Sequence, residues 1–152
     1  MKVRDIGIKE IFSAEPSTDL SEIASMMKRY DVGTIPVCEG DKLLGMVTDR
    51  DIVTSCVADN MNPKKCLAKE FMTTDLTTVT PDIDLGEAAA LMGQRQVRRL
   101  PVVEGGNLVG IISLGDIAVA TSSNGSIATE ALRQISSPTP MRFAKGLPYH
   151  SA

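Results

Sequence analysis

Two pairs of residues, each a hydroxyl followed three positions later by a carboxylate, have the spacing to bind a sugar phosphate. Thr48 precedes Asp51 and Ser113 precedes Asp116, and each pair follows a short apolar run. At the start of a helix, such a carboxylate can accept both hydroxyls of a ribose diol, while the hydroxyl and unpaired backbone N–H groups can contact phosphate. The same spacing forms a capping box, which only stabilises the helix start, so both interpretations stay open.

Both pairs lie inside an internal repeat. A shift of 65 residues aligns residues 16–53 with residues 81–118 without a gap, and 15 of the 38 aligned positions are identical. Such self-similarity predicts two copies of one structural unit that pack on each other.

The first helix of each copy has a clear start. It follows Asp19 in one copy and Asp84 in the other, where an acid at the N-cap with a Glu three residues later satisfies free N–H groups. Apolar residues then recur at i, i+3, i+4 and i+7, which predicts a helix with one buried face. In the first copy this face comprises Leu20, Ile23, Ala24 and Met27.

A hairpin and a second helix follow in each copy. Two short apolar runs around a Glu-Gly turn predict the hairpin, and the second helices are expected at about 49–57 and 114–120. The segments before Pro16 and Pro81 can supply a first strand. Each unit is therefore predicted to be βαββα.

These elements predict an α+β fold, with two βαββα units packed sheet to sheet in pseudo-two-fold symmetry. One unit of about 55–60 residues buries too little surface to be stable alone. We expect the first unit at residues 1–58, a turn-rich linker at 59–67 and the second unit at 68–122. Residues 123–152 are expected to form one further helix and a flexible tail.

Composition excludes several classes of function. The net charge of −3 and the pI of about 5.2 give no basic field to attract nucleic acid. No apolar stretch is long enough for a membrane span or signal peptide. Three cysteines without a CxxC pair suit reduced thiols in the cytoplasm, not a disulfide framework or a metal site. His150, the only histidine, lies near the chain end, which leaves no positioned imidazole for a Ser-His-Asp or Cys-His mechanism.

The repeat resembles a known family, the tandem CBS domain or Bateman module. The first copy carries VGTIPV at 32–37 and GMVTDRDI at 45–52, and the second carries VRRLPV at 97–102 and GIISLGDI at 110–117. The resemblance covers about residues 2–122. It implies two clefts between the units that bind adenine ligands such as AMP, ADP, ATP or S-adenosylmethionine. It also implies a homodimer, a regulated partner protein and no obligatory cofactor. No enzyme, channel or transporter domain accompanies the repeat, so we expect a stand-alone protein.

The resemblance assigns roles to residues of both copies. Asp51 and Asp116 would bind ribose, together with Thr48 and Ser113. Guanidinium groups bind phosphate oxygens in a bidentate fashion. The phosphate ligands would be Arg98, Arg99 and Arg50. The adenine pockets would be lined by Thr34, Ile35, Pro36, Leu100, Pro101, Thr77, Thr78 and Ser13.

These assignments have structural alternatives. Arg98 and Arg99 stand where the first copy has glycine and threonine, which makes the cleft of Asp116 the better phosphate site. The two arginines could equally be solvated or pair with Glu104. The Ile-Pro and Leu-Pro pairs also fit ordinary strand-edge packing. We expect the two clefts to differ, because the first copy has Phe12 and Ser13 where the second has Thr77 and Thr78.

These observations favour a ligand-sensing module without catalysis, in which an adenine ligand changes how the two units or two protomers pack. The alternative is a ligand-free protein-interaction and dimerisation module with vestigial clefts. An enzyme is the weakest hypothesis, since the chain has neither a P-loop GxxxxGK[ST] nor a GxGxxG fingerprint. The sequence leaves open which adenine ligand binds, whether one or both clefts are filled, and which partner is regulated.

Overall fold

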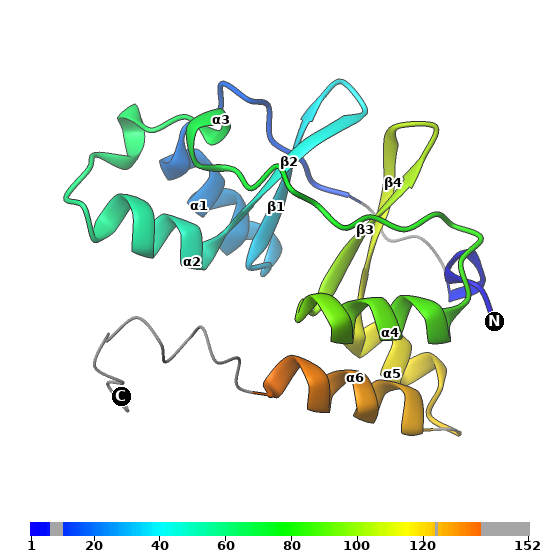
Figure 1. Cartoon of the computed structure of the whole chain (residues 1–152). Coiled ribbons are helices and arrows are strands. Elements are labelled where there is room, and N and C mark those ends of the chain that lie inside the picture. Colours follow the sequence, from blue (N-terminus) through cyan, green and yellow to red (C-terminus); the bar gives the residue numbers. More distant parts are fainter. Residues whose placement is uncertain (7–10, 124, 138–152) are drawn as a thin grey trace.

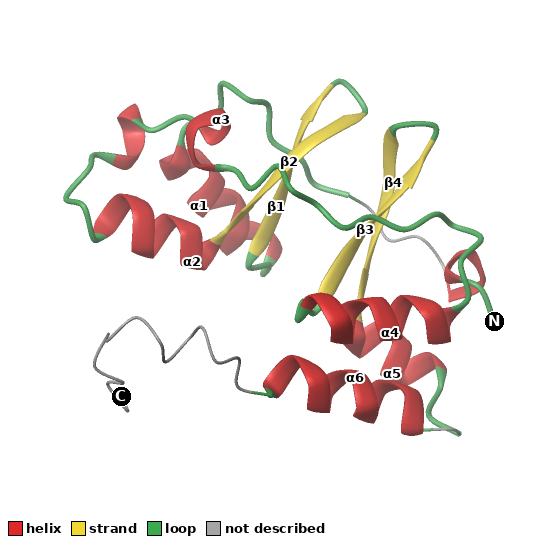
Figure 2. Ribbon diagram, viewed as in Figure 1, coloured by secondary structure: helices red, strands yellow, loops and turns green. Residues whose placement is uncertain are grey.

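The computed structural model describes residues 1–6, 11–123 and 125–137, so most of the expected flexible tail, with His150, lies outside the described residues. The first unit contains α1 (Leu20–Tyr30), β1 (Thr34–Glu39), β2 (Lys42–Thr48) and a helix that starts as α2 (Asp49–Asp51) and continues as the π-helix η2 (Ile52–Val57). The second unit contains α4 (Leu85–Arg95), β3 (Arg99–Glu104), β4 (Asn107–Ser113) and α5 (Leu114–Ala120). Both combine helices with an antiparallel hairpin, which confirms the α+β class (Figure 2).

The two hairpins have the same register. Thr34 pairs with Thr48 and Arg99 pairs with Ser113, and each further pair in one hairpin is related by 65 residues to a pair in the other. A bulge interrupts both ladders at the equivalent position, after Val37 and after Val102. The predicted pseudo-two-fold relation is therefore present in the backbone itself.

The hairpins meet at one edge. A single pair, Lys42 with Asn107, joins β2 to β4, so the strands follow the order β1–β2–β4–β3. At this junction the N–H of Leu108 donates to the carbonyl oxygen of Asp41 at 2.8 Å. The hairpins lie between the helices of the first unit and those of the second (Figure 2). The two units therefore pack through their strands, as predicted.

The expected first strands are reduced to single bridges. Ala14 forms a parallel bridge with Val37, and Val79 forms the equivalent bridge with Val102. Pro16 and Pro81 follow two residues later in each case. Because proline has no N–H to donate, it cannot extend such a ladder, and the strand stops after one pair.

The first long helix of each unit starts and ends in the same way. The side chain of Asp19 accepts the N–H of Glu22 at 2.9 Å, and that of Asp84 accepts the N–H of Gly86 at 2.8 Å. Both helices end at a residue in the left-handed region, Asp31 or Gln96. The prediction that Ala24 belongs to the buried face is wrong, because this side chain is exposed at the edge of the apolar stripe.

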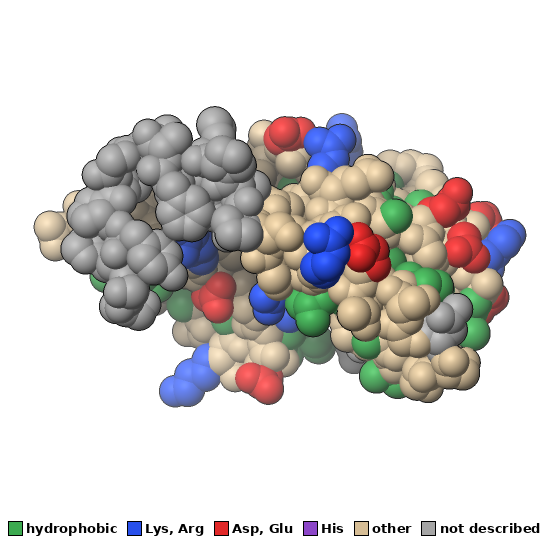
Figure 3. Space-filling view, turned by 60° about the horizontal axis from the view of Figure 1, so that its bottom comes forward, with side chains coloured by type: hydrophobic (Ala, Val, Ile, Leu, Met, Phe, Trp, Pro, Cys, Tyr) green, Lys and Arg blue, Asp and Glu red, His purple; other side chains and the backbone are tan. Residues whose placement is uncertain are grey.

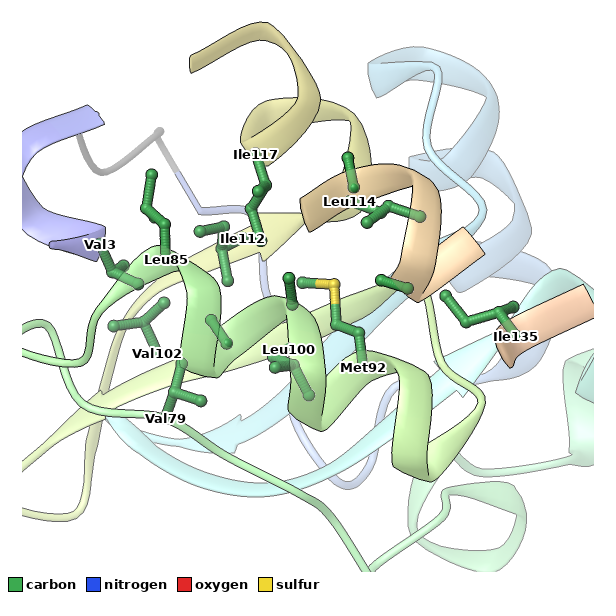
Figure 4. Close-up of a cluster of buried hydrophobic side chains, with 14 residues drawn as sticks. Val3, Val79, Leu85, Met92, Leu100, Val102, Ile112, Leu114, Ile117 and Ile135 are labelled. Atoms are coloured by element: carbon green, nitrogen blue, oxygen red, sulfur yellow. The ribbon is translucent and has the colours of Figure 1, made fainter. Parts of the chain in front are cut away.

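The two units exchange their N-terminal helices. η1 (Val3–Ile6) lies beside the second unit, where the N–H of Val3 donates to the carbonyl oxygen of Ile83 at 3.0 Å. Val3 is buried at the edge of the second hydrophobic core, near Leu85 (Figure 4). In return, α3 (Ala68–Phe71) lies beside α1 of the first unit (Figure 1), and Ala68 is buried in the first core. Neither core is therefore completed by its own copy of the repeat.

The second unit has an additional helix, α6 (Ser126–Ser136), which packs along α4 (Figure 1). Its buried face adds Ala128, Ala131 and Ile135 to the second core. The Nε2 of Gln96 donates to the carbonyl oxygens of Gln134 at 3.2 Å and Ser137 at 3.1 Å, which satisfies the end of this helix. In the first unit the short helix η3 (Pro63–Lys65) packs against α1 instead.

Candidate functional site

A pocket lies where the first unit faces the start of α5. Its volume is about 240 Å³, somewhat below the range of about 300–1,000 Å³ common for ligand pockets. One unit supplies Ile11, Phe12, Val32, Thr34, Ile35 and Pro36, and the other supplies Arg99, Ile111, Ser113 and Asp116. The carboxylate of one repeat thus faces the Ile-Pro motif of the other, which the sequence alone did not indicate.

The polar end of the pocket is built on the N-terminus of α5. Ser113 is the N-cap of this helix, and its hydroxyl accepts the N–H of Asp116 at 3.1 Å. One oxygen of Asp116, Oδ2, accepts the N–H of Ser113 at 2.8 Å and its hydroxyl at 2.6 Å. This capping box fixes the orientation of the carboxylate, and Asp116 still lines the pocket in a half-buried position. Capping and ligand binding are therefore compatible roles for the same residue.

Arg99 is the cationic residue of the pocket lining. It is the first residue of β3, directly opposite Ser113 in the hairpin, and its side chain is exposed. A guanidinium beside a helix N-terminus suits phosphate oxygens. Its neighbour Arg98 is also exposed but does not line the pocket.

The rest of the pocket lining is mainly apolar. It combines Ile11 and Phe12 with Val32, Ile35 and Ile111. The carbonyl oxygen of Pro36, which could have contacted a ligand edge, instead accepts the N–H of Ala14 at 2.9 Å. These residues therefore give the pocket a mainly apolar surface.

The other predicted site residues lie outside this pocket. Thr48 and Asp51 form the equivalent capping box at the start of α2, with the N–H of Thr48 donating to Asp51 Oδ2 at 2.9 Å. Leu100 and Pro101 are buried in β3, and the carbonyl oxygen of Pro101 accepts the N–H of Val79. Thr77 is half-buried, and the remaining predicted residues are exposed: Ser13, Arg50, Thr78 and Arg98.

Four lining residues were not predicted as site residues: Ile11, Phe12, Val32 and Ile111. Val32 and Ile111 lie inside the two motifs of the repeat. Each is two residues before a predicted site residue, Thr34 or Ser113, so a slightly wider prediction would have included them. Phe12 gave a signal as well, because it is an aromatic residue at the position of Thr77.

The described part of the chain shows no metal centre and no membrane span. Within it, no group of three or more His, Cys, Asp or Glu side chains could hold a metal ion. No described helix is long and apolar enough to cross a membrane. Cys38, Cys56 and Cys66 are free and buried. On the face seen in Figure 3, Lys and Arg side chains lie in small groups beside Asp and Glu side chains.

Comparison with known proteins identifies the repeated unit. The family described as "CBS domain" matches the chain twice, at residues 3–58 and 68–123. The chain belongs to the CBS domain family. This CBS pair is 42% identical over 134 residues to the CBS domain-containing protein YhcV of Bacillus subtilis, which covers 88% of this chain and 94% of YhcV.

Two solved structures of CBS proteins are similar to this CBS pair. Hypoxic Response Protein I, solved with two coordinated zinc ions, is 33% identical with a TM-score of 0.71 and covers 79% of this chain and 98% of its own. The CBS domain pair of protein MJ0100, solved in complex with 5′-methylthioadenosine and S-adenosyl-L-methionine, is 26% identical with a TM-score of 0.71. That match covers 81% of this CBS pair and 97% of the other chain.

Proposed function

We propose that this CBS pair binds an adenine nucleotide in the pocket between β1 and the start of α5, and that it regulates a partner protein in the cytoplasm without catalysis of its own. One observation carries this proposal: the pocket joins Ser113, Asp116 and Arg99 to an apolar wall from the other unit. The adenosyl compounds bound to the related MJ0100 pair support an adenine ligand. The three free cysteines support a reducing compartment.

Each polar residue has a distinct role in this proposal. The Asp116 carboxylate accepts hydrogen bonds from the ribose diol, and the Ser113 hydroxyl lies beside it. Arg99 binds the phosphate. Because Arg99 is cationic, AMP, ADP and ATP are favoured over S-adenosylmethionine, whose sulfonium carries a positive charge. No obligatory cofactor is needed.

Calorimetry with AMP, ADP, ATP and S-adenosylmethionine tests this proposal. We expect binding tighter than millimolar, and Asp116→Ala should weaken it at least tenfold because a charge-assisted hydrogen bond is lost. Asp19→Ala is the matched control, since it removes an N-cap carboxylate from the start of α1 but no residue of the described pocket. Affinity that is undetectable for every adenine compound, or unchanged by Asp116→Ala, would contradict the proposal.

A second cleft around Asp51 follows from the repeat. Shifting the pocket residues by 65 positions predicts that Thr48 and Asp51 face Leu76, Thr77, Val97, Leu100 and Pro101. Arg50, Arg98, Thr78 and Ser13 would lie at the rims of the two clefts. This cleft has a hydroxyl at Thr77 where the described pocket has Phe12, so we propose that the two clefts bind ligands with different affinity.

We also propose that the CBS pair forms a homodimer. The helix that follows the hairpin in each unit carries exposed valines: Val53 and Val57 on η2 are 57% and 58% exposed, and Val119 on α5 is 79% exposed. Exposed apolar side chains of this kind favour a protein contact. Val53→Glu and Val119→Glu should each disrupt this contact and lower the sedimentation coefficient from that of a dimer to that of a monomer.

The ligand-free interaction module remains the second candidate function, because the same exposed valines could serve a protein partner alone. A thermal shift screen separates the two candidates. Ligand that binds only the native state must raise the melting temperature by mass action. A rise with adenine compounds supports the sensor, and a flat response across them supports the ligand-free module.

A further inference from the structure

An aromatic pair forms one wall of the candidate pocket. Phe12 lines the pocket, and its ring is stacked on that of Tyr30, with centroids 3.6 Å apart and planes only 6° from parallel. Tyr30 is the last residue of α1, so this helix fixes the position of the ring that packs against Phe12. The Cζ of Arg29 lies over the Tyr30 ring, 5.8 Å from its centroid, and this cation–π contact further fixes the pair.

The stack leaves a defined part of Phe12 for a ligand. Tyr30 covers one face of the ring, so only the opposite face and the edge are left for contact with the pocket. The ring is half-buried, and its neighbour in the lining, Ile11, is apolar as well. A flat, rigid, apolar surface of this kind suits a planar ring far better than a sugar or a phosphate.

The repeat shows that this surface is specific to one cleft. The position equivalent to Phe12 is Thr77, and the position equivalent to Tyr30 is Arg95. Neither residue can form an aromatic stack. The polar ends of the two clefts, in contrast, carry the same carboxylate and hydroxyl pair in the same capping box.

We propose that Phe12 is the base-selecting residue of this pocket, that Tyr30 is its positioning residue, and that a purine ring stacks on the face of Phe12 turned away from Tyr30. This inference rests on the proposed function, because the ribose and phosphate must first be bound by Asp116 and Arg99. Stacking on an aromatic side chain tolerates different bases, since every base has a π-face. The pocket therefore distinguishes bases by the size of their planar ring. We expect AMP to bind more tightly than UMP, and both nucleotides to bind more tightly than ribose 5-phosphate.

The experiment separates the base from the sugar phosphate. Calorimetry on the full chain compares AMP, UMP and ribose 5-phosphate with wild type and with Phe12→Leu, which keeps an apolar side chain but removes the π-face. We expect the variant to bind AMP about tenfold more weakly and ribose 5-phosphate with unchanged affinity. Phe71→Leu is the matched control, because Phe71 is a half-buried phenylalanine that packs on the first core and does not line the pocket. It should leave all three affinities unchanged.

The outcomes distinguish this inference from the proposed function. Unchanged AMP affinity in Phe12→Leu, or equal weakening of AMP and ribose 5-phosphate, would overturn the role of Phe12 and leave the nucleotide site intact. If none of the three compounds binds to the wild-type protein, the proposed function and this inference are both refuted. Should Phe12→Leu fail to fold, wild type alone still decides, because equal affinity for AMP and ribose 5-phosphate contradicts a base-selecting wall.

Discussion

Thr34 and Arg99 occupy the same position in the two repeats, yet both line one pocket. Each is the first residue of its hairpin and pairs with the hydroxyl residue of a capping box, Thr48 or Ser113. Because the repeat relates Thr34 to Arg99, the position that they share would adjoin both the described pocket and the proposed second cleft. A cation at this place would then act on a ligand in either one.

The position of Arg99 predicts a phosphate-specific effect. Arg99→Ala should weaken AMP about tenfold and leave adenosine nearly unaffected, because only the phosphate contact is lost. Arg133→Ala is the control, since this arginine on α6 is also exposed and does not line the pocket. Calorimetry at two salt concentrations checks the result, because the Arg99 contribution should shrink as salt rises. An equal effect of the two substitutions would mean that general charge, not the pocket, attracts the phosphate.

The close contact between α4 and α6 at Gly93 predicts that a larger side chain at this position destabilises the protein. A Cβ on Gly93 would collide with Oε1 of Gln134 and lie 3.0 Å from its Cδ and 3.2 Å from its Cβ. Gly93→Ala gains about 1 kcal/mol of helix propensity, but overpacking typically costs about 1–3 kcal/mol. We therefore expect a net loss of about 1 kcal/mol in the free energy of unfolding, measured by urea denaturation.

A second substitution isolates the cause of that loss. Gln134→Ala removes Oε1 and Cδ, the two atoms that a new Cβ would approach most closely, and leaves only Cβ at 3.2 Å. The double variant should therefore recover most of the stability that Gly93→Ala costs in the wild-type background. If the double variant gains nothing, the close approach of the two helices is not what requires glycine.

The sequence predicted the elements that local chemistry determines. The second helices were expected at about 49–57 and 114–120, and the structure has them at Asp49–Val57 and Leu114–Ala120, because the capping pairs define where each one starts. The hairpins were equally predictable, since a Glu-Gly turn separates apolar runs in both copies. Presence in two copies made each pattern more reliable than one occurrence would have been.

The sequence did not predict which unit completes which core or which pocket. An apolar pattern shows that Val3 and Ala68 must be buried, but not that each is buried in the core of the other unit. For the same reason, the sequence did not indicate which Ile-Pro or Leu-Pro motif lies beside Asp116, which lines a pocket with Ile35 and Pro36 of the other repeat. Such pairings depend on how the units pack, and local patterns carry no information about that.

The buried thiols predict low reactivity of the native protein. Burial raises the pKa of the Cys38 thiol and that of the Cys66 thiol, the latter also through the neighbouring Cys56, whose Sγ lies 3.9 Å away. The thiolate is the reactive form, so a raised pKa keeps these groups protonated and inert at pH 8. We expect a disulfide reagent such as DTNB to react slowly with the native protein and with all three cysteines after unfolding. Fast release of one equivalent from the native protein would contradict this burial.

Attachment of η1 to the second unit should depend on pH. Arg4 donates to Asp82 at 2.9 Å and, with Lys2, holds the pKa of that carboxyl below its usual value near 4. A depressed folded-state pKa stabilises the fold above the unfolded pKa, and the effect is lost as pH falls through the folded value. We therefore expect wild type to lose melting temperature below about pH 4 more steeply than Asp82→Asn, which has no carboxylate to protonate there. Protection of the Val3 N–H, which donates to Ile83, should fall over the same pH range in wild type only, measured relative to the intrinsic exchange rate at each pH. The Arg4–Asp82 ion pair is exposed, so 0.5 M salt should reduce the difference in acid sensitivity between wild type and Asp82→Asn. Identical melting temperatures of the two proteins at every acidic pH and low salt would show that Asp82 does not hold η1.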